Sequence, residues 1–67
     1  MTNKIYLVTS KELIETSKAG EKVFIEYRDK EEEIENAEKF ENYDWEFTLA
    51  VYSRLFSTNY VKFFKRI

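Results

Sequence analysis

The sequence predicts a small α+β domain, and three observations support this prediction. Short runs rich in β-branched and aromatic residues, which are typical of strands, occur near both ends of the chain. Residues 9–20 have the cap residues and the apolar spacing of a helix. An acidic segment in the middle repeats apolar residues every three positions, which also indicates a helix. We therefore expect a single α+β domain over residues 1–67, in the order β-α-β-α-β-β, with a C-terminal β-hairpin and helices on one face of the sheet.

The first three elements are predicted from local signals. Residues 4–8, KIYLV, predict a strand. Thr9 and Glu12 have the spacing of a capping box, so a helix is expected over residues 10–19, and Gly20 stands where a left-handed helix end belongs. The alternating run at residues 21–28 predicts the second strand. These two strands could form a right-handed parallel crossover, but the linkage is short for one, so an antiparallel arrangement is also open.

The acidic segment, residues 29–46, holds nine of the thirteen acidic residues and two lysines. Asp29 is a suitable N-cap, and the glutamates that follow it would lie at the positive end of the helix dipole. Ile34, Ala37 and Phe40 recur every three residues and form a narrow apolar stripe. The pattern predicts a mostly solvated helix that ends near Asn42.

Residues 45–55 fit two patterns. As a strand, apolar and polar residues alternate over much of the segment. As a helix capped by Asp44, the segment places Trp45, Leu49, Tyr52 and Phe56 on one stripe. Aromatic and β-branched residues dominate, so we favour the strand, joined by a loop at residues 57–59 to a final strand at residues 60–67.

The predicted hairpin aligns side chains on two faces. The loop that keeps one face apolar pairs Ser53 with Phe63 and Leu55 with Val61. It also places Asn59 at a left-handed position, which asparagine tolerates well. The other face would then be an open surface of rings and cations, which comprises Tyr52, Phe56, Tyr60, Phe64, Arg54, Lys62 and Arg66.

The composition argues against catalysis. The chain has no histidine and no cysteine, and its single glycine excludes a phosphate-binding glycine loop. We therefore expect no enzyme, no cofactor and no metal site. No segment approaches the roughly 20 apolar residues of a membrane span, and no signal-peptide core is present, so a cytoplasmic protein without membrane contact is expected.

The small size predicts association. A core of this size supplies only about 3–5 kcal/mol unless disulfides, metals or oligomerisation add to it. Without cysteine or histidine, a homodimer or a bound partner is the expected source of extra stability.

The segregation of charge suggests a non-catalytic protein-binding module that inhibits or modulates another protein. Acidic side chains on a helix, spaced similarly to phosphates, could mimic nucleic acid in salt-dependent contacts, and the ring surface would form a dry interface. Small cysteine-free chains of this kind are also expected among inhibitors carried by mobile elements. The predicted partner-binding residues are Glu31, Glu35, Glu38, Glu41, Tyr52, Phe56, Tyr60 and Phe64.

Two other classes of function stay open. Rings beside cations can bind single-stranded nucleic acid by stacking, here with Arg54, Lys62 and Arg66. The acidic segment would repel phosphate, which makes this class the weaker one. A structural subunit that only self-assembles is the third class.

Overall fold

The computed structural model describes residues 3–67 and confirms an α+β fold with four strands. The elements differ in part from the predicted order, because the strand-helix-strand start is followed by a hairpin strand and not by a helix. In chain order they are β1 (Lys4–Leu7), α1 (Ser10–Lys18), β2 (Val23–Tyr27), β3 (Lys30–Ile34), the 3₁₀ helix η1 (Ala37–Phe40), α2 (Trp45–Leu55) and β4 (Lys62–Arg66).

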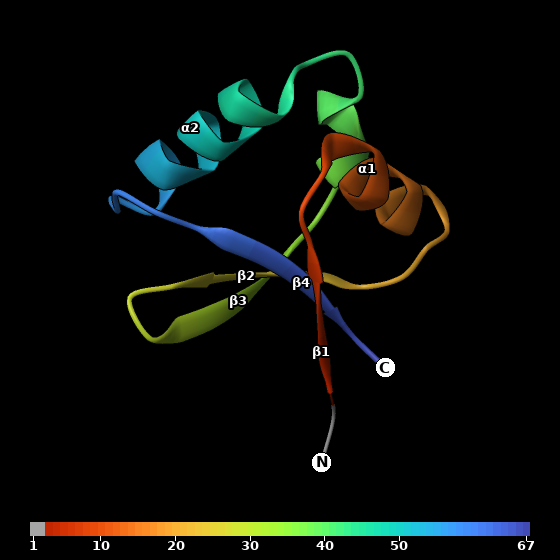
Figure 1. The fold of residues 1–67 in the computed structure, drawn as a ribbon, viewed down its shortest axis with the longest axis horizontal. Helices are drawn as coiled ribbons and strands as arrows, with labels where there is room; N and C mark the ends of the chain where they lie inside the picture. Colours follow the sequence, from red (N-terminus) through yellow and green to blue (C-terminus); the bar gives the residue numbers. More distant parts are fainter. Residues whose placement is uncertain (1–2) are drawn as a thin grey trace.

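The sheet is antiparallel throughout, with the strand order β1-β4-β2-β3. Strand β4 lies between β1 and β2, so these two strands are parallel to each other without being neighbours. Figure 1 shows α1, η1 and α2 on the same side of the sheet, as expected. Among residues 3–67, no helix lies on the opposite side of the sheet, which we call the helix-free face.

The first helix follows its sequence signals. The Thr9 hydroxyl oxygen accepts from the Glu12 N–H at 3.2 Å. The Glu12 carboxylate accepts from the Thr9 hydroxyl and from the Val8 N–H, both at 3.1 Å. The helix ends at Lys18, Ala19 is its C-cap, and Gly20 follows with a φ of 80°. The Thr9 cap, supported by the Glu12 carboxylate, and a left-handed glycine therefore define the two ends of α1.

The predicted acidic helix is wrong, because residues 30–34 form strand β3. Arg28 and Asp29 both have positive φ, at 46° and 63°, which is the backbone of a tight hairpin turn. This turn pairs Tyr27 with Lys30 and Val23 with Ile34. Of the predicted apolar stripe, only Ala37 and Phe40 are helical; they lie in η1, where a repeat of three residues per turn buries both side chains.

The predicted C-terminal hairpin is also wrong, because residues 45–55 form helix α2. The Asp44 carboxylate caps this helix by accepting from the Phe47 N–H at 2.7 Å. The helical alternative is confirmed: Trp45, Leu49, Tyr52 and Phe56 all pack against the core. Strand β4 consequently pairs with β1 and β2, and the expected Ser53–Phe63 and Leu55–Val61 pairs do not form.

The main core lies between the sheet and the helices. Helix α2 reaches it through large rings, with centroid distances of 5.4 Å for Trp45–Phe63 and 5.2 Å for Tyr52–Phe63. Tyr52 also lies 5.3 Å from Phe40 of η1. The buried members of this core are Leu7, Leu13, Ile14, Val23, Ile25, Ala37, Phe40, Tyr52, Val61 and Phe63.

Candidate interaction surfaces

The four glutamates predicted to form one acidic array lie on different parts of the molecule. Glu31 lies in β3 and pairs with Lys4 and Arg66 across the helix-free face. Glu38 in η1 accepts from the Ser17 hydroxyl, which lowers the pKa of this carboxyl. Glu41 pairs with Lys18 of α1, and Glu35 is exposed in the loop after β3. Three of the four therefore contact other elements of the same chain.

The four predicted rings also separate. Tyr52 is buried in the core and Phe56 packs against Tyr27 with a centroid distance of 4.7 Å, because α2 turns both toward the sheet. Phe64 is fully buried on the helix-free face, and only Tyr60 is exposed. A single dry surface made of these rings is therefore excluded.

A row of three rings crosses the helix-free face. The strand register places Tyr6 of β1 and Phe24 of β2 on either side of Phe64 in β4. Phe24 stacks on Phe64 at 5.4 Å, and Tyr6 meets the Phe64 ring edge-on at 6.0 Å. The sequence pattern missed this row because it depends on β4 lying between β1 and β2.

Charged side chains cover this row. The Lys4 ammonium lies 4.9 Å from the centre of the Phe64 ring, and the Arg66 guanidinium lies 5.1 Å from it. Lys4 pairs with Glu26 at 3.0 Å, and Glu31 accepts from both cations. We call Lys4, Arg66, Glu26 and Glu31 the charged lid. The lid explains why Phe64 is 0% exposed on a face that no helix covers.

The lid also shifts the protonation of its members. Hydrogen bonds from Lys4 and then from the Tyr6 hydroxyl lower the pKa of Glu26. The Lys4 ammonium likewise lowers the pKa of Glu31, and the two glutamates in turn raise the pKa of Lys4. All three groups are therefore held in their charged forms over the ring row.

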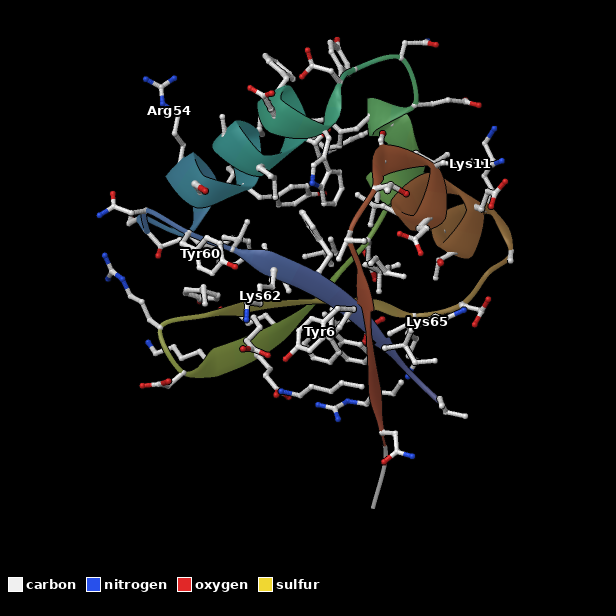
Figure 2. All side chains as sticks on the ribbon, in the orientation of Figure 1. Tyr6, Lys11, Arg54, Tyr60, Lys62 and Lys65 are labelled. Carbon is white, nitrogen blue, oxygen red and sulfur yellow. The ribbon has the colours of Figure 1, made fainter. Side chains whose placement is uncertain are left out.

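One edge of the helix-free face is more open. Lys62 lies 5.3 Å from the Tyr6 ring and 5.8 Å from the Tyr60 ring. The two tyrosines are 40% and 66% exposed. Figure 2 shows Tyr60, Lys62 and Tyr6 on this face, whereas Arg54 points away from the sheet on α2. The cations predicted for nucleic acid, Arg54, Lys62 and Arg66, therefore do not form one groove.

The outer side of α2 carries a second apolar stripe that sequence reasoning missed. Tyr43 and Phe47 stack at 4.9 Å while remaining 50% and 47% exposed. Ala50 is exposed one turn further along α2, Val51 beside it is half-buried and also packs against the core, and the exposed Arg54 ends the stripe. We call Tyr43, Phe47, Ala50, Val51 and Arg54 the α2 surface. Their spacing, i, i+4, i+7, i+8 and i+11, is the one a helix uses to bury a face, although Tyr43 precedes the N-cap Asp44. Tyr43, Phe47, Ala50 and Arg54 stay exposed in the described chain, whereas Val51 is partly covered by the core.

The α2 surface borders a hollow. The hollow has a volume of about 480 Å³ and lies between α2 and the loop that leads to β4. Its lining is apolar at Phe47, Leu49, Ala50 and Val51 and polar at Ser53, Arg54, Thr58 and Asn59. A lining that is half apolar suits a side chain of a protein partner better than it suits a phosphate.

Among residues 3–67, no three carboxylates come together in a way that could hold a metal ion. None of the helices in this described part is long and apolar enough to cross a membrane. Comparisons with protein-family models, with curated proteins and with solved structures find no match. The function of this chain is therefore inferred from its surface chemistry.

Proposed function

We propose that this protein is a non-catalytic binding module that docks on another protein through the α2 surface and thereby inhibits or modulates it. The observation that carries the proposal is the stacked, half-exposed Tyr43–Phe47 pair at the N-terminal end of α2, where Phe47 lies in the first turn and Tyr43 just precedes the cap residue. Aromatic side chains are enriched at protein interfaces, where a few of them supply most of the binding energy.

Charge indicates the chemistry of the partner. Asp44 and Glu46 stand beside the Tyr43–Phe47 pair, and both are exposed. The Asp44 carboxylate accepts only a backbone N–H, and Glu46 makes no ion pair within residues 3–67. A partner with an apolar patch bordered by lysine or arginine would complement this end of α2. Mimicry of nucleic acid by an acidic helix is not part of the proposal, because that helix is absent.

The test compares three baits in nuclease-treated extract of the native host. The baits are the wild type, Phe47→Glu and Tyr60→Glu, which changes an exposed ring outside the α2 surface. A protein recovered by the wild type is then purified and titrated calorimetrically against each bait. Loss of a central aromatic anchor costs about 2 kcal/mol or more, so Phe47→Glu should weaken binding roughly 30-fold. Tyr60→Glu should bind as the wild type does.

The result that would contradict the proposal is a bound protein that tolerates Phe47→Glu. A recovered protein that is lost only with Tyr60→Glu would place the docking site on the helix-free face instead.

Binding of single-stranded nucleic acid is the second candidate, favoured by Lys62 between the exposed rings of Tyr6 and Tyr60. Such rings can stack on bases. Two features oppose it: Phe64 is buried, and Glu26 and Glu31 lie on the same face. A labelled oligonucleotide titrated with the wild type and with Lys62→Glu separates the two candidates. Submicromolar binding that weakens with salt and is lost in Lys62→Glu would favour nucleic acid over a protein partner.

A further inference from the structure

The two outer strands of the sheet differ in their protection. Strand β3 carries charged residues at positions 30–33, which discourage pairing with a further strand. Strand β1 has one charged residue, Lys4, and its side chain is drawn over the sheet by Glu26 and Glu31. Ile5 and Tyr6 are each 40% exposed along this edge. Strand β1 is therefore the edge on which another strand can be added.

The backbone groups that β1 offers follow from its register. The Asn3 carbonyl accepts from the Ile67 N–H at 3.2 Å, so the backbone of Asn3 faces β4. Because this direction alternates along a strand, Ile5 and Leu7 also face β4, and Lys4 and Tyr6 face outward. The Val8 N–H faces outward too, but it donates to the Glu12 carboxylate at 3.1 Å. The outward pairing groups are therefore the N–H and C=O of Lys4 and Tyr6.

We propose that a second copy of this chain pairs with β1 antiparallel, about a two-fold axis at Ile5, to form one eight-stranded sheet. In this register Lys4 of each copy lies opposite Tyr6 of the other, and all four outward pairing groups of each copy are used. Ile5 meets Ile5 on the helix side of the sheet. A lysine opposite a tyrosine ring is favourable, and two isoleucines suit a cross-strand pair.

The neighbouring two-fold registers are worse for identifiable reasons. An axis at Lys4 would place two lysines directly opposite each other, which is repulsive. An axis at Tyr6 would pair Lys4 with Val8, whose N–H is already bonded to Glu12. In the Ile5 register, the β4 residue opposite Ile5 is Lys65. Lys65 forms an ion pair with Glu21 at 3.6 Å, so the positive charge beside the two-fold axis is balanced.

The test is a single-cysteine cross-link, which the absence of native cysteine makes unambiguous. Two residues 5 on the axis would form a non-hydrogen-bonded pair with Cα atoms about 4.5 Å apart, within the range of a disulfide. Two residues 8 would be separated by six strand positions, about 20 Å. Ile5→Cys should therefore form a disulfide dimer under mild oxidation at least tenfold faster than Val8→Cys or Leu55→Cys, two controls at more exposed positions.

Sedimentation equilibrium supplies the second measurement. The wild type should sediment at twice the 8.2 kDa mass of the chain. Ile5→Lys, which opposes two cations on the axis, should weaken the dimer at least tenfold, and Phe47→Glu should leave it unchanged. Because Ile5 is partly exposed, circular dichroism should show both Ile5 variants folded.

A wild-type monomer would overturn the proposal, and so would a dimer that cross-links no faster through Ile5→Cys than through the control cysteines. Loss of the dimer in Phe47→Glu alone would assign self-association to the α2 surface. These results are independent of whether a different protein binds that surface.

Discussion

Replacement of Phe64 by alanine tests whether the helix-free face is a closed second core or an open surface. The Phe64 ring is 0% exposed and contacts two rings and two cations. Removing a fully buried phenylalanine costs about 3–5 kcal/mol, whereas an exposed ring can be removed at a cost of about 0.5 kcal/mol or less. At about 0.05–0.15 kcal/mol per residue, this domain has only a small total stability. Phe64→Ala should therefore lose most of it.

The assay is equilibrium unfolding in urea, followed by the fluorescence of Trp45, whose ring packs on Phe63 in the main core. Phe64→Leu keeps most of the buried volume and should remain folded with a lower midpoint, so it gives a measurable value if the alanine variant does not fold. Tyr60→Ala removes a 66% exposed ring two positions before β4 and is the matched control. A Phe64→Ala midpoint close to that of Tyr60→Ala would refute the reasoning, since the charged lid would then cover nothing of energetic value.

Two further variants and one pH series test other parts of the fold. Asp44→Ala removes the cap of α2 and should destabilise the protein by about 1 kcal/mol, whereas Asp44→Asn should keep the cap; equal urea midpoints for the two would contradict the assignment. Gly20→Ala should cost about 1 kcal/mol or more, because alanine is strained at a φ of 80° although nothing crowds it; an unchanged midpoint would argue against a left-handed end of α1. The charged lid should make stability fall in acid. The pKa values of Glu26 and Glu31 lie below the ordinary 4.5, so their contribution is complete above pH 4.5 and is lost as the pH falls through the lowered values. As the pH falls, the urea midpoint of the double variant Glu26→Gln and Glu31→Gln should decrease less than that of the wild type.

The parts of the fold that the sequence predicted correctly depend on contacts between near neighbours. The Thr9 cap, the Gly20 helix end and the alternation in β2 each need only a few adjacent residues. The acidic segment failed because its hairpin turn uses Arg28 and Asp29, which carry no glycine or asparagine signal for a left-handed turn. The spacing of Ala37 and Phe40 was a real helical signal, but for a single 3₁₀ turn.

The candidate surfaces could be predicted less well, because long-range pairing creates them. The lid joins Lys4 of β1 to Glu31 of β3, which lie at opposite edges of the sheet. No spacing in the sequence indicates this pair. For α2, the sequence showed the stripe that packs against the core. It also held further apolar residues on the outer side of the helix, and this second signal was missed. A helix with apolar residues on both sides has one side left for a partner unless the rest of the chain covers it.

The two proposed interfaces are compatible because they use different residues. The β1 edge consists of residues 4–6, and the α2 surface begins at Tyr43. A dimer formed through β1 would therefore present two α2 surfaces related by its two-fold axis. A partner that is itself dimeric, or that carries two sites at a matching distance, would then bind with an affinity about 10²–10⁴ times higher than one surface provides. Dimerisation would add stability to a 67-residue domain whose core is small. It would also favour a partner whose two sites match the spacing of the two α2 surfaces.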